Sequence, residues 1–241
     1  MIRGVTFDLE GPIVNCESLH FESFSHACRD QNFIIDFPTI IRELPQVIGG
    51  GDQKIAEEIS GFSKGKVIIP QLIERKKHYY DQALQEREQL QPRAGFLTVL
   101  DWIICAAELP VAIGSSTPRE EAEILLQKSG VRDWFSDNSI ICAEDVTDRK
   151  PAPDVYLETA YRMKINPDEQ LIFEDSVTGL RAVKAAGSIG IAIPLYHFSH
   201  ILTSLIEAGA ERIFMEWTEM NIKALIANLN TSQLIKNSRL C

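Results

Sequence analysis

The sequence has none of the features that mark disulfide-stapled, zinc-binding or membrane-spanning proteins. Its five cysteines are odd in number and form no Cys-x-x-Cys pair, which argues against a disulfide framework and against a zinc site. Apolar runs stay shorter than the roughly eighteen residues that a membrane span needs. A strand-like segment at the start of the sequence predicts that there is no signal peptide. These absences predict a cytoplasmic protein with reduced thiols.

Clusters of basic residues are also missing. Lysines and arginines number 24 against 34 aspartates and glutamates, so the formal net charge is −10. Because nucleic acids and anionic membranes bind positive patches, we expect neither as a partner. An acidic protein still binds a phosphate ester when local lysines, backbone amides and a metal ion supply the attraction.

Residues 3–15, RGVTFDLEGPIVN, contain the first candidate site. An apolar run typical of a buried strand ends at Asp8, and Glu10 follows in a loop that Gly11 and Pro12 make possible. Two carboxylates this close repel each other, and a bound divalent cation would remove the repulsion. The alternative is a solvated strand end whose acids have no function, and this segment alone does not decide between the two.

Residues 17–89 indicate helices with no strand between them. Helices are predicted over residues 17–32, 38–47, 53–59 and 66–89. The glycines Gly49, Gly50 and Gly51 mark a loop before the third of these helices, and Asp52 is placed to cap it. This stretch is therefore expected to be a small helical domain inserted directly after the first strand.

Short apolar strands alternate with helices in the rest of the chain. Strands are predicted at residues 110–115, 139–142, 170–173, 189–193 and 212–214. Helices are predicted over residues 94–107, 118–129, 154–163, 177–186, 199–208 and 218–228, followed by a frayed polar end. The alternation predicts an α/β fold, in which helices cover both faces of a parallel sheet.

Polar residues fall at or after the ends of four predicted strands. They are Asp8, Ser115, Lys150 and the pair Glu174 and Asp175. Because parallel strands end at one edge of their sheet, and ligands bind at that edge, we expect these side chains to meet there.

Phosphoryl transfer needs this set of groups. Asp8 is expected to be the nucleophile that forms an aspartyl phosphate. Glu174 and Asp175 offer the oxygen ligands that Mg²⁺ prefers, beside Asp8, while Lys150 pairs with Asp8 and with the phosphoryl oxygens.

The remaining roles fall to hydroxyl, amide and carboxyl groups. Ser115 would donate its hydroxyl, and the Ser116 backbone amide would complete the phosphate cradle. Glu10 would protonate the leaving oxygen and later activate water. Each residue also has a structural alternative: Lys150 as a charge before a helix, Ser115 as a turn former, and the Glu174–Asp175 pair as a helix cap.

Four ordered segments resemble the motifs of the haloacid dehalogenase superfamily. They are FDLEGPIVNCESLH, VAIGSST, RKPAPDVY and IFEDSVTGL. The resemblance implies a Rossmann-like core at residues 1–13 and 92–241, and an α-helical cap domain at 14–91. It also implies Mg²⁺-dependent hydrolysis of a small phosphate monoester, with Asp8 as nucleophile and Glu10 as acid/base. Ser115 and Lys150 would hold the phosphoryl group. Mg²⁺ would bind Asp8, Glu174, Asp175 and the backbone carbonyl of Glu10.

Glu10 departs from the family pattern, which has Asp at this position. Glu extends about one bond further, on the order of 1 Å, and a displacement of that size costs roughly a hundredfold in rate. The sequence thus predicts an active phosphatase that is slow if the site does not accommodate Glu10. On this basis Glu10→Asp would preserve or raise turnover and Asp8→Asn would abolish it.

Two other functions remain open from the sequence. A β-phosphoglucomutase-like activity would use His20 beside the acid/base and Lys76 to hold a second phosphate. The resemblance also places contacts to the substrate in the loop of Gly49, Gly50 and Gly51. However, this loop lacks the arginine that a mutase would use, and Asp52 would repel phosphate. For Lys76 the structural alternative is a place in a solvated run of charges, and this alternative is favoured over a phosphate contact. For His20 the structural alternative is interdomain packing, and both readings stay open. A catalytically weakened relative that binds a partner is the other possibility. The oligomeric state is open, with a monomer slightly favoured.

Overall fold

The computed structural model of the protein describes residues 1–44 and 51–238, with the backbone alone for residues 37, 41, 42 and 236–238. Two compact units make up the chain. The core unit comprises Met1–Asn15 and Leu90–Cys241, and the helical unit comprises Cys16–Gln89. The predicted loop residues Gly49 and Gly50 lie outside the described residues.

The core unit is built on a parallel sheet of six strands in the order β3-β2-β1-β4-β5-β6, which confirms the predicted fold class. The strands are β1 (Gly4–Phe7), β2 (Val111–Gly114), β3 (Ile140–Ile141), β4 (Gln170–Glu174), β5 (Ile189–Ala192) and β6 (Arg212–Ile213). Phe7, the last residue of β1, aligns with Ile113 of β2 and Phe173 of β4. The residues that follow these three strands therefore lie side by side at one edge.

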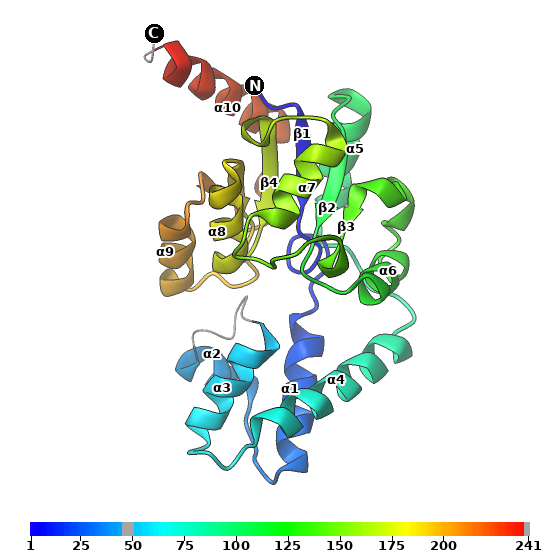
Figure 1. The fold of residues 1–241 in the computed structure, drawn as a ribbon, viewed down its shortest axis with the longest axis vertical. Helices are drawn as coiled ribbons and strands as arrows, with labels where there is room; N and C mark the ends of the chain where they lie inside the picture. Colours follow the sequence, from blue (N-terminus) through cyan, green and yellow to red (C-terminus); the bar gives the residue numbers. More distant parts are fainter. Residues whose placement is uncertain (45–50, 239–241) are drawn as a thin grey trace. The chain divides into compact units, whose positions relative to one another are not determined.

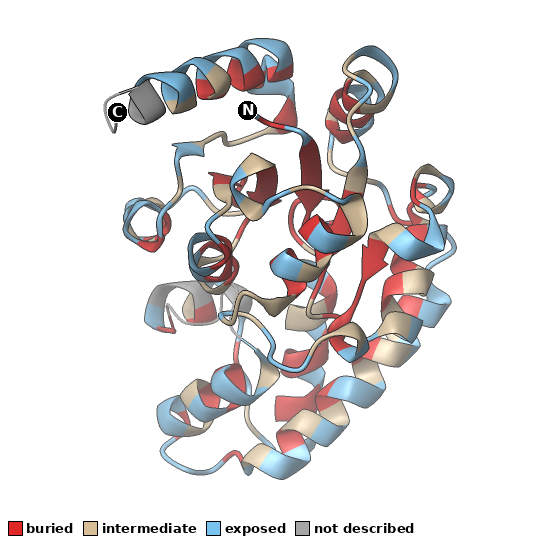
Figure 2. Cartoon of the chain, turned by 45° about the horizontal axis from the view of Figure 1, so that its top comes forward, coloured by how far each residue is buried: buried red, intermediate tan, exposed pale blue. Residues whose placement is uncertain are grey.

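Helices bury both faces of this sheet (Figures 1 and 2). Against one face lie α7 (Asp154–Met163) and α8 (Val177–Ala186), where Ile172 of β4 meets Tyr156 of α7. On the other face Phe7 contacts Phe96, Phe173 and Trp217 in an aromatic cluster. Strands covered on both faces are buried at every position, which is why β1 reads as a largely apolar run and not as an alternation. Its one polar side chain, Thr6, accepts a hydrogen bond from Gln170.

The remaining helices of the core unit surround this centre. They are α5 (Phe96–Asp101), α6 (Arg119–Lys128), α9 (Ser199–Ala208) and α10 (Ile222–Ser238). The helix predicted over 94–107 is α5 followed by a π-helical turn at Trp102–Ala106. The frayed end was a wrong prediction up to Ser238, because α10 extends that far. The side chains that this helix buries, Leu225, Ile226 and Leu229, lie before that end.

The helical unit contains α1 (Glu17–Asp30), α2 (Phe37–Glu43), α3 (Asp52–Phe62) and α4 (Ile69–Glu86). Helices α1 and α4 pack along each other, and Phe24, Ala27 and Leu72 belong to their shared apolar core. The prediction that Asp52 caps α3 was wrong. Gly51 is the capping residue, and the Asp52 carboxylate binds Lys76 instead.

Lys76 also differs from its prediction as part of a solvated charge run. Its side chain is 4% exposed, because the ammonium binds the Asp52 carboxylate and lies over the Tyr80 ring. A lysine among charged neighbours on a helix lies on either face depending on its position in the turn, and here it falls on the face with Leu72 and Tyr80.

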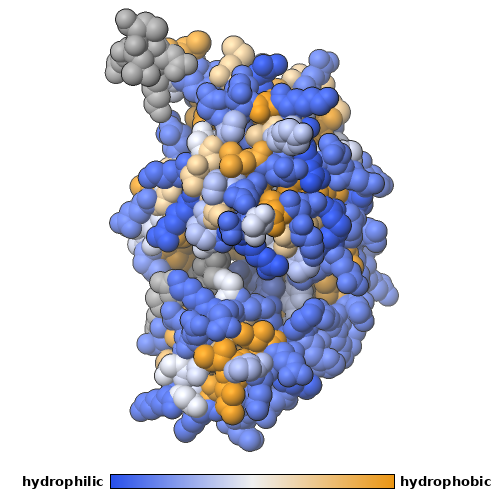
Figure 3. Space-filling model, in the orientation of Figure 1, coloured by the Kyte–Doolittle hydropathy of each residue, from blue (hydrophilic) through white to orange (hydrophobic). Residues whose placement is uncertain are grey.

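The described surface is largely hydrophilic on the face shown in Figure 3, in keeping with the excess of acidic residues. Across residues 1–44 and 51–238 we find no helix that combines the length and the apolar character a membrane crossing demands.

Candidate active site

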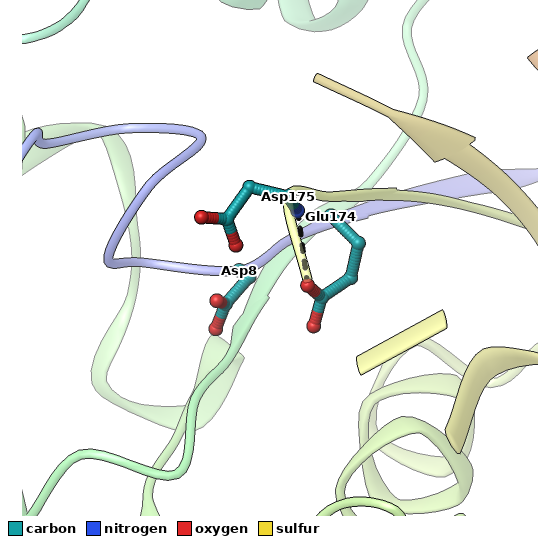
Figure 4. A group of neighbouring side chains, drawn as sticks. All are labelled: Asp8, Glu174 and Asp175. Carbon is teal, nitrogen blue, oxygen red and sulfur yellow. Dashed lines mark hydrogen bonds between the residues drawn. The ribbon is translucent and has the colours of Figure 1, made fainter. Parts of the chain in front are cut away.

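Three carboxylates meet at the carboxyl edge of the sheet. Asp8 directly follows β1, Glu174 is the last residue of β4, and Asp175 follows it. One oxygen of each lies within 4.8 Å of the others, and the side chains turn toward one another (Figure 4). The Asp8 backbone amide donates to the Phe173 carbonyl over 2.9 Å, which extends the pairing of the two strands up to the site. Register and strand order thus bring together residues 166 positions apart.

Lys150 reaches this cluster through the loop after β3. Its ammonium, on a side chain 7% exposed, lies 2.8 Å from Asp8 Oδ1 and 2.8 Å from Glu174 Oε1. Burial would lower the pKa of this ammonium, but the two carboxylates hold it above its ordinary value. Lys150 therefore stays charged, and it offsets one of the three negative charges of the site.

The two acids that Lys150 contacts differ in acidity. Burial raises the pKa of Asp8 to about 7; the Lys150 ammonium opposes this rise and the Glu174 carboxylate adds to it. Burial would also raise the pKa of Glu174, but Lys150 and the Tyr156 hydroxyl hold that pKa below its ordinary value. Of these two acids, Asp8 therefore holds a proton more readily than Glu174.

Glu174 is held by five hydrogen bonds. Its Oε1 accepts from Lys150 Nζ at 2.8 Å and from the Tyr156 hydroxyl at 2.5 Å. Its Oε2 accepts from the Asp175 amide and from the Ser176 amide and hydroxyl at 3.0–3.2 Å. A Cβ on Gly179 would lie 1.8 Å from Oε1, so only glycine leaves room for this carboxylate. Ser176 also caps α8 by accepting from the Gly179 amide, which excludes Glu174 and Asp175 as its cap.

The turn after β1 fits closely against Asp175. Gly11 has φ +96°, in the left-handed region, and a Cβ there would lie 2.2 Å from Asp175 Oδ2. The Gly11 amide donates to the Val14 carbonyl over 2.8 Å, which closes the turn. The Trp217 indole N–H donates to the Pro12 carbonyl over 2.8 Å. The backbone that carries Asp8 and Glu10 is therefore anchored from the aromatic cluster.

Arg93 is a second anchor of this turn. Its guanidinium, 7% exposed, forms a salt bridge with Glu216 at 3.3 Å. It also donates to four backbone carbonyls, those of Gly11 (3.2 Å), Ile193 (2.7 Å), Pro194 (3.3 Å) and Met215 (3.0 Å). One side chain thereby joins the Asp8 turn to the loops after β5 and β6.

Ser115, Thr117 and Glu10 form a chain of hydrogen bonds beside Asp8. The Ser115 hydroxyl donates to Thr117 Oγ1 over 2.9 Å, and the Thr117 hydroxyl donates to Glu10 Oε1 over 2.5 Å. Ser115 and Thr117 are buried, and Glu10 is half-buried. The half-buried Ser116 lies between them in the loop after β2.

The helical unit has a polar cluster of its own. Lys76 Nζ lies 2.9 Å from both oxygens of Asp52 and 2.9 Å from His20 Nδ1, and the His20 ring stacks on Tyr80 with centroids 4.3 Å apart. Because the Lys76 ammonium donates only, Nδ1 accepts and the His20 proton resides on Nε2. Gly51, exposed at the start of α3, was expected to contact the substrate, and that expectation stays a prediction.

Four residues of the core site were missed from sequence: Thr117, Tyr156, Gly179 and Arg93. Tyr156 and Gly179 lie inside the motif segments RKPAPDVY and IFEDSVTGL. Their position inside these motif segments is the feature of the sequence that could have identified them as site residues. Thr117 ends the segment VAIGSST. Arg93 carried no signal, because its partners lie in loops about 80 to 120 residues away.

The donor set fits a hard divalent cation. Asp8 and Asp175 contribute buried carboxylates, and within residues 1–44 and 51–238 no histidine or cysteine belongs to the cluster, which is the chemistry that Mg²⁺ selects. Since both oxygens of Glu174 already accept hydrogen bonds, its carboxylate is suited to hold Lys150 and the backbone after β4 more than to bind the ion directly.

Comparison with known proteins identifies the family. The pattern described as haloacid dehalogenase-like hydrolase matches residues 5–193. The chain belongs to the haloacid dehalogenase-like hydrolase family. It is an enzyme of this hydrolase family, as the motif segments predicted.

Its relatives in the haloacid dehalogenase-like family include phosphatases. Fructose-1-phosphate phosphatase YqaB of Escherichia coli K12 is 26% identical over 80% of this chain and 96% of that protein. A phosphorylated carbohydrates phosphatase of Thermotoga maritima is 25% identical over 87% of this chain and 92% of that protein.

The fold has close counterparts among solved structures. The β-phosphoglucomutase of Clostridium difficile superposes with a TM-score of 0.74 at 19% identity, over 97% of this chain and 100% of that one. At this identity the likeness establishes the shared fold alone.

Proposed function

We propose that the protein hydrolyses a small phosphate monoester, with Mg²⁺ as cofactor and an aspartyl phosphate on Asp8 as intermediate. One observation carries the proposal above the others: the Asp8 carboxylate is buried between the Lys150 ammonium and two further acids. A carboxylate in this place has a counter-charge for the incoming phosphoryl group on one side and a cation site on the other.

In this proposal Asp8 attacks the phosphorus, and Lys150 screens the repulsion between the carboxylate and the phosphoryl oxygens. Glu174 and Tyr156 keep Lys150 in place, since Oε1 of Glu174 accepts from both. Ser115 and the Ser116 amide, in the loop after β2, donate to the phosphoryl oxygens. Asp8, Asp175 and the Glu10 carbonyl would hold Mg²⁺. When bound, the ion neutralises charge that develops on the transferred group.

Glu10 is the acid/base of the proposed reaction. It protonates the leaving oxygen as the aspartyl phosphate forms, and it later takes a proton from the water that hydrolyses this intermediate. It lies two positions after the nucleophile, with Leu9 between them, and the turn that follows is anchored by Trp217 and Arg93. Both groups can then act on opposite sides of one phosphoryl group.

Phosphorylated sugars are the substrate class that we propose first. The relatives that are named as phosphatases act on fructose 1-phosphate and on phosphorylated carbohydrates. In this proposal the helical unit is the cap domain that selects the sugar, with His20 among its contact residues.

The pairing of Lys76 favours a phosphatase over a mutase. A mutase must hold a second phosphate, and Lys76 was the candidate from sequence. Its ammonium is buried and contacts both oxygens of Asp52 at 2.9 Å, so the pair has no net charge to offer a phosphate. The likeness to the fold of β-phosphoglucomutase is no counter-argument, because a shared fold does not supply a positive charge for a second phosphate.

The test is a phosphate-release screen over sugar phosphates and p-nitrophenyl phosphate, in Mg²⁺ and in EDTA. Wild type should release phosphate in Mg²⁺ alone, without isomerising the sugar in a coupled assay. Asp8→Asn should be inactive, whereas the exposed-site control Asp133→Asn should match wild type. Equal activity of wild type and Asp8→Asn removes the nucleophile assignment, and a silent panel favours the partner-binding alternative.

A further inference from the structure

The hydrogen bond between Thr117 and Glu10 has no part in the roles assigned above. It spans 2.5 Å and joins residues 107 positions apart, on the loops after β2 and β1. The donor is the Thr117 hydroxyl and the acceptor is a carboxyl oxygen of Glu10, so the contact is a direct hydrogen bond between the two side chains. Thr117 is 7% exposed, so little water competes for the interaction. The contact is therefore a specific restraint on the Glu10 carboxyl group.

The Thr117 hydroxyl is itself held in place. Its oxygen accepts from the Ser115 hydroxyl at 2.9 Å, and the Thr117 backbone amide donates back to Ser115 Oγ at 3.2 Å. A hydroxyl that accepts one hydrogen bond directs its own proton elsewhere, here to Oε1 of Glu10. Without substrate, the order Ser115, Thr117, Glu10 thus gives the chain one direction. When Ser115 turns its single proton to a phosphoryl oxygen, as proposed above, Thr117 still donates to Glu10, because an ionised carboxylate accepts only.

This direction determines where Glu10 carries a proton. An oxygen that accepts from Thr117 is a poor site for the proton of the neutral acid, so that proton resides on Oε2. The same hydrogen bond to Oε1 persists when Glu10 is ionised. Thr117 therefore serves the acid form and the base form without moving.

The extra length of glutamate is what allows the contact. Backbone anchors at Gly11 and Pro12 fix the turn, so the carboxyl group reaches Thr117 through its side chain alone. An aspartate is shorter by one methylene, on the order of 1 Å of reach, and at that separation a hydrogen bond of 2.5 Å is lost.

The geometry points to Thr117 as the positioning residue that orients Glu10 for proton transfer to the leaving group. This inference rests on the proposed phosphatase function and deepens it. The chain has a glutamate where the family pattern has an aspartate, and the Thr117 hydroxyl lies where it can donate to the carboxylate of this longer side chain. On this inference Glu10→Asp lowers turnover, the opposite of the expectation from sequence.

Leaving-group dependence separates this role from a purely structural one. A poor leaving group, such as the alkoxide of a sugar phosphate, needs a proton from the acid, whereas p-nitrophenolate does not. We would measure kcat/KM, in Mg²⁺, for sugar phosphates and for a series of aryl phosphates with increasingly basic phenols. The variants are Thr117→Val, Thr117→Ser, Glu10→Gln and Glu10→Asp.

Thr117→Val should lower kcat/KM on sugar phosphates by roughly tenfold or more and on p-nitrophenyl phosphate by less than about threefold, because general acid catalysis contributes 10²–10⁴. Its dependence on leaving-group basicity should approach that of Glu10→Gln, and Thr117→Ser should restore the wild-type slope. The exposed Thr231→Val, also in the core unit, is the matched control.

Each outcome is decisive. If Thr117→Val lowers all substrates by one factor, Thr117 is structural and the inference is wrong. The same holds if Glu10→Asp equals wild type on sugar phosphates. Thermal unfolding of each variant identifies a folding defect, in which case Thr117→Ser provides the comparison. If wild type itself releases no phosphate from any substrate, the proposed function fails, and this result differs from the others.

Discussion

The guanidinium of Arg93 donates a hydrogen bond to the carbonyl oxygen of Gly11, 82 residues earlier in the chain, over 3.2 Å. Gly11 in turn lies so close to Asp175 that a side chain there would overlap the Asp175 carboxylate. Arg93 thus holds a turn that follows the proposed nucleophile and lies against a proposed metal ligand.

Arg93→Met is expected to destabilise the protein by about 3 kcal/mol or more, since it leaves several buried carbonyls without their charged donor. It should also lower kcat on phosphate esters, because the turn that carries Asp8 loses its anchor. Thermal unfolding and steady-state kinetics test both effects. Arg212→Met is the control, since Arg212 is exposed. A stable Arg93→Met variant with wild-type kcat would contradict the anchoring role.

The contribution of Asp8 to the stability of the metal-free protein should fall as the pH rises from about 4 to about 7. The pKa of Asp8 is about 7 in the folded protein and 3.8 in an unperturbed aspartate, so the folded state binds more protons between these pH values. The slope of unfolding free energy with pH is then negative across this window, and the full penalty is present above it.

Asp8→Asn removes this titration. In EDTA at pH 8 the variant should unfold several degrees above wild type, and the difference should shrink toward pH 4. Thermal denaturation across the pH range measures it, and Asp133→Asn controls for a general effect of removing one negative charge. A constant difference between Asp8→Asn and wild type at all pH values would show that Asp8 does not titrate in this window.

Tyr156→Phe is expected to weaken Mg²⁺ activation. The Tyr156 hydroxyl donates to Glu174 Oε1 over 2.5 Å, and the substitution removes this bond while it keeps the ring below Lys150. Groups that orient a metal site in this way typically contribute 10–100-fold in affinity or activity, and we expect roughly tenfold. The Mg²⁺ concentration for half-maximal activity measures the effect. The exposed Tyr161→Phe is the control. If the Mg²⁺ concentration for half-maximal activity does not change, the contribution of Tyr156 is the packing of its ring alone.

Gly179→Ala should abolish phosphatase activity, whereas Gly61→Ala should leave it unchanged. The added Cβ at position 179 would lie 1.8 Å from Glu174 Oε1, and the carboxylate would have to leave Lys150. At Gly61, near the end of α3, nothing lies within 4 Å, so alanine there should stabilise the protein by about 0.5–1 kcal/mol. Phosphatase assays and thermal unfolding of the two variants test this contrast. Wild-type activity in Gly179→Ala would show that the reaction does not require the Glu174 carboxylate beside Lys150.

Much of the fold and part of the site could be predicted from the sequence alone. Apolar runs that end in acids located the ends of β1 and β4, and therefore placed Asp8, Glu174 and Asp175 at the edge of the sheet. These predictions depend on local periodicity and on the rule that parallel strands end together, neither of which needs side-chain coordinates. The resemblance of the motif segments to the haloacid dehalogenase superfamily is confirmed by the family match.

The tertiary structure alone decided how these residues are held. The effect of a glutamate at position 10 could not be predicted from sequence, because it depends on which residue the longer side chain contacts. That residue, Thr117, lies 107 positions away in the chain. Lys76 was assigned to a solvated run, since a sequence does not say which helix face is covered. Arg93 had no pattern around it at all. Hydrogen bonds between distant loops depend on distances that chain order does not determine, whereas strand ends follow from the local sequence.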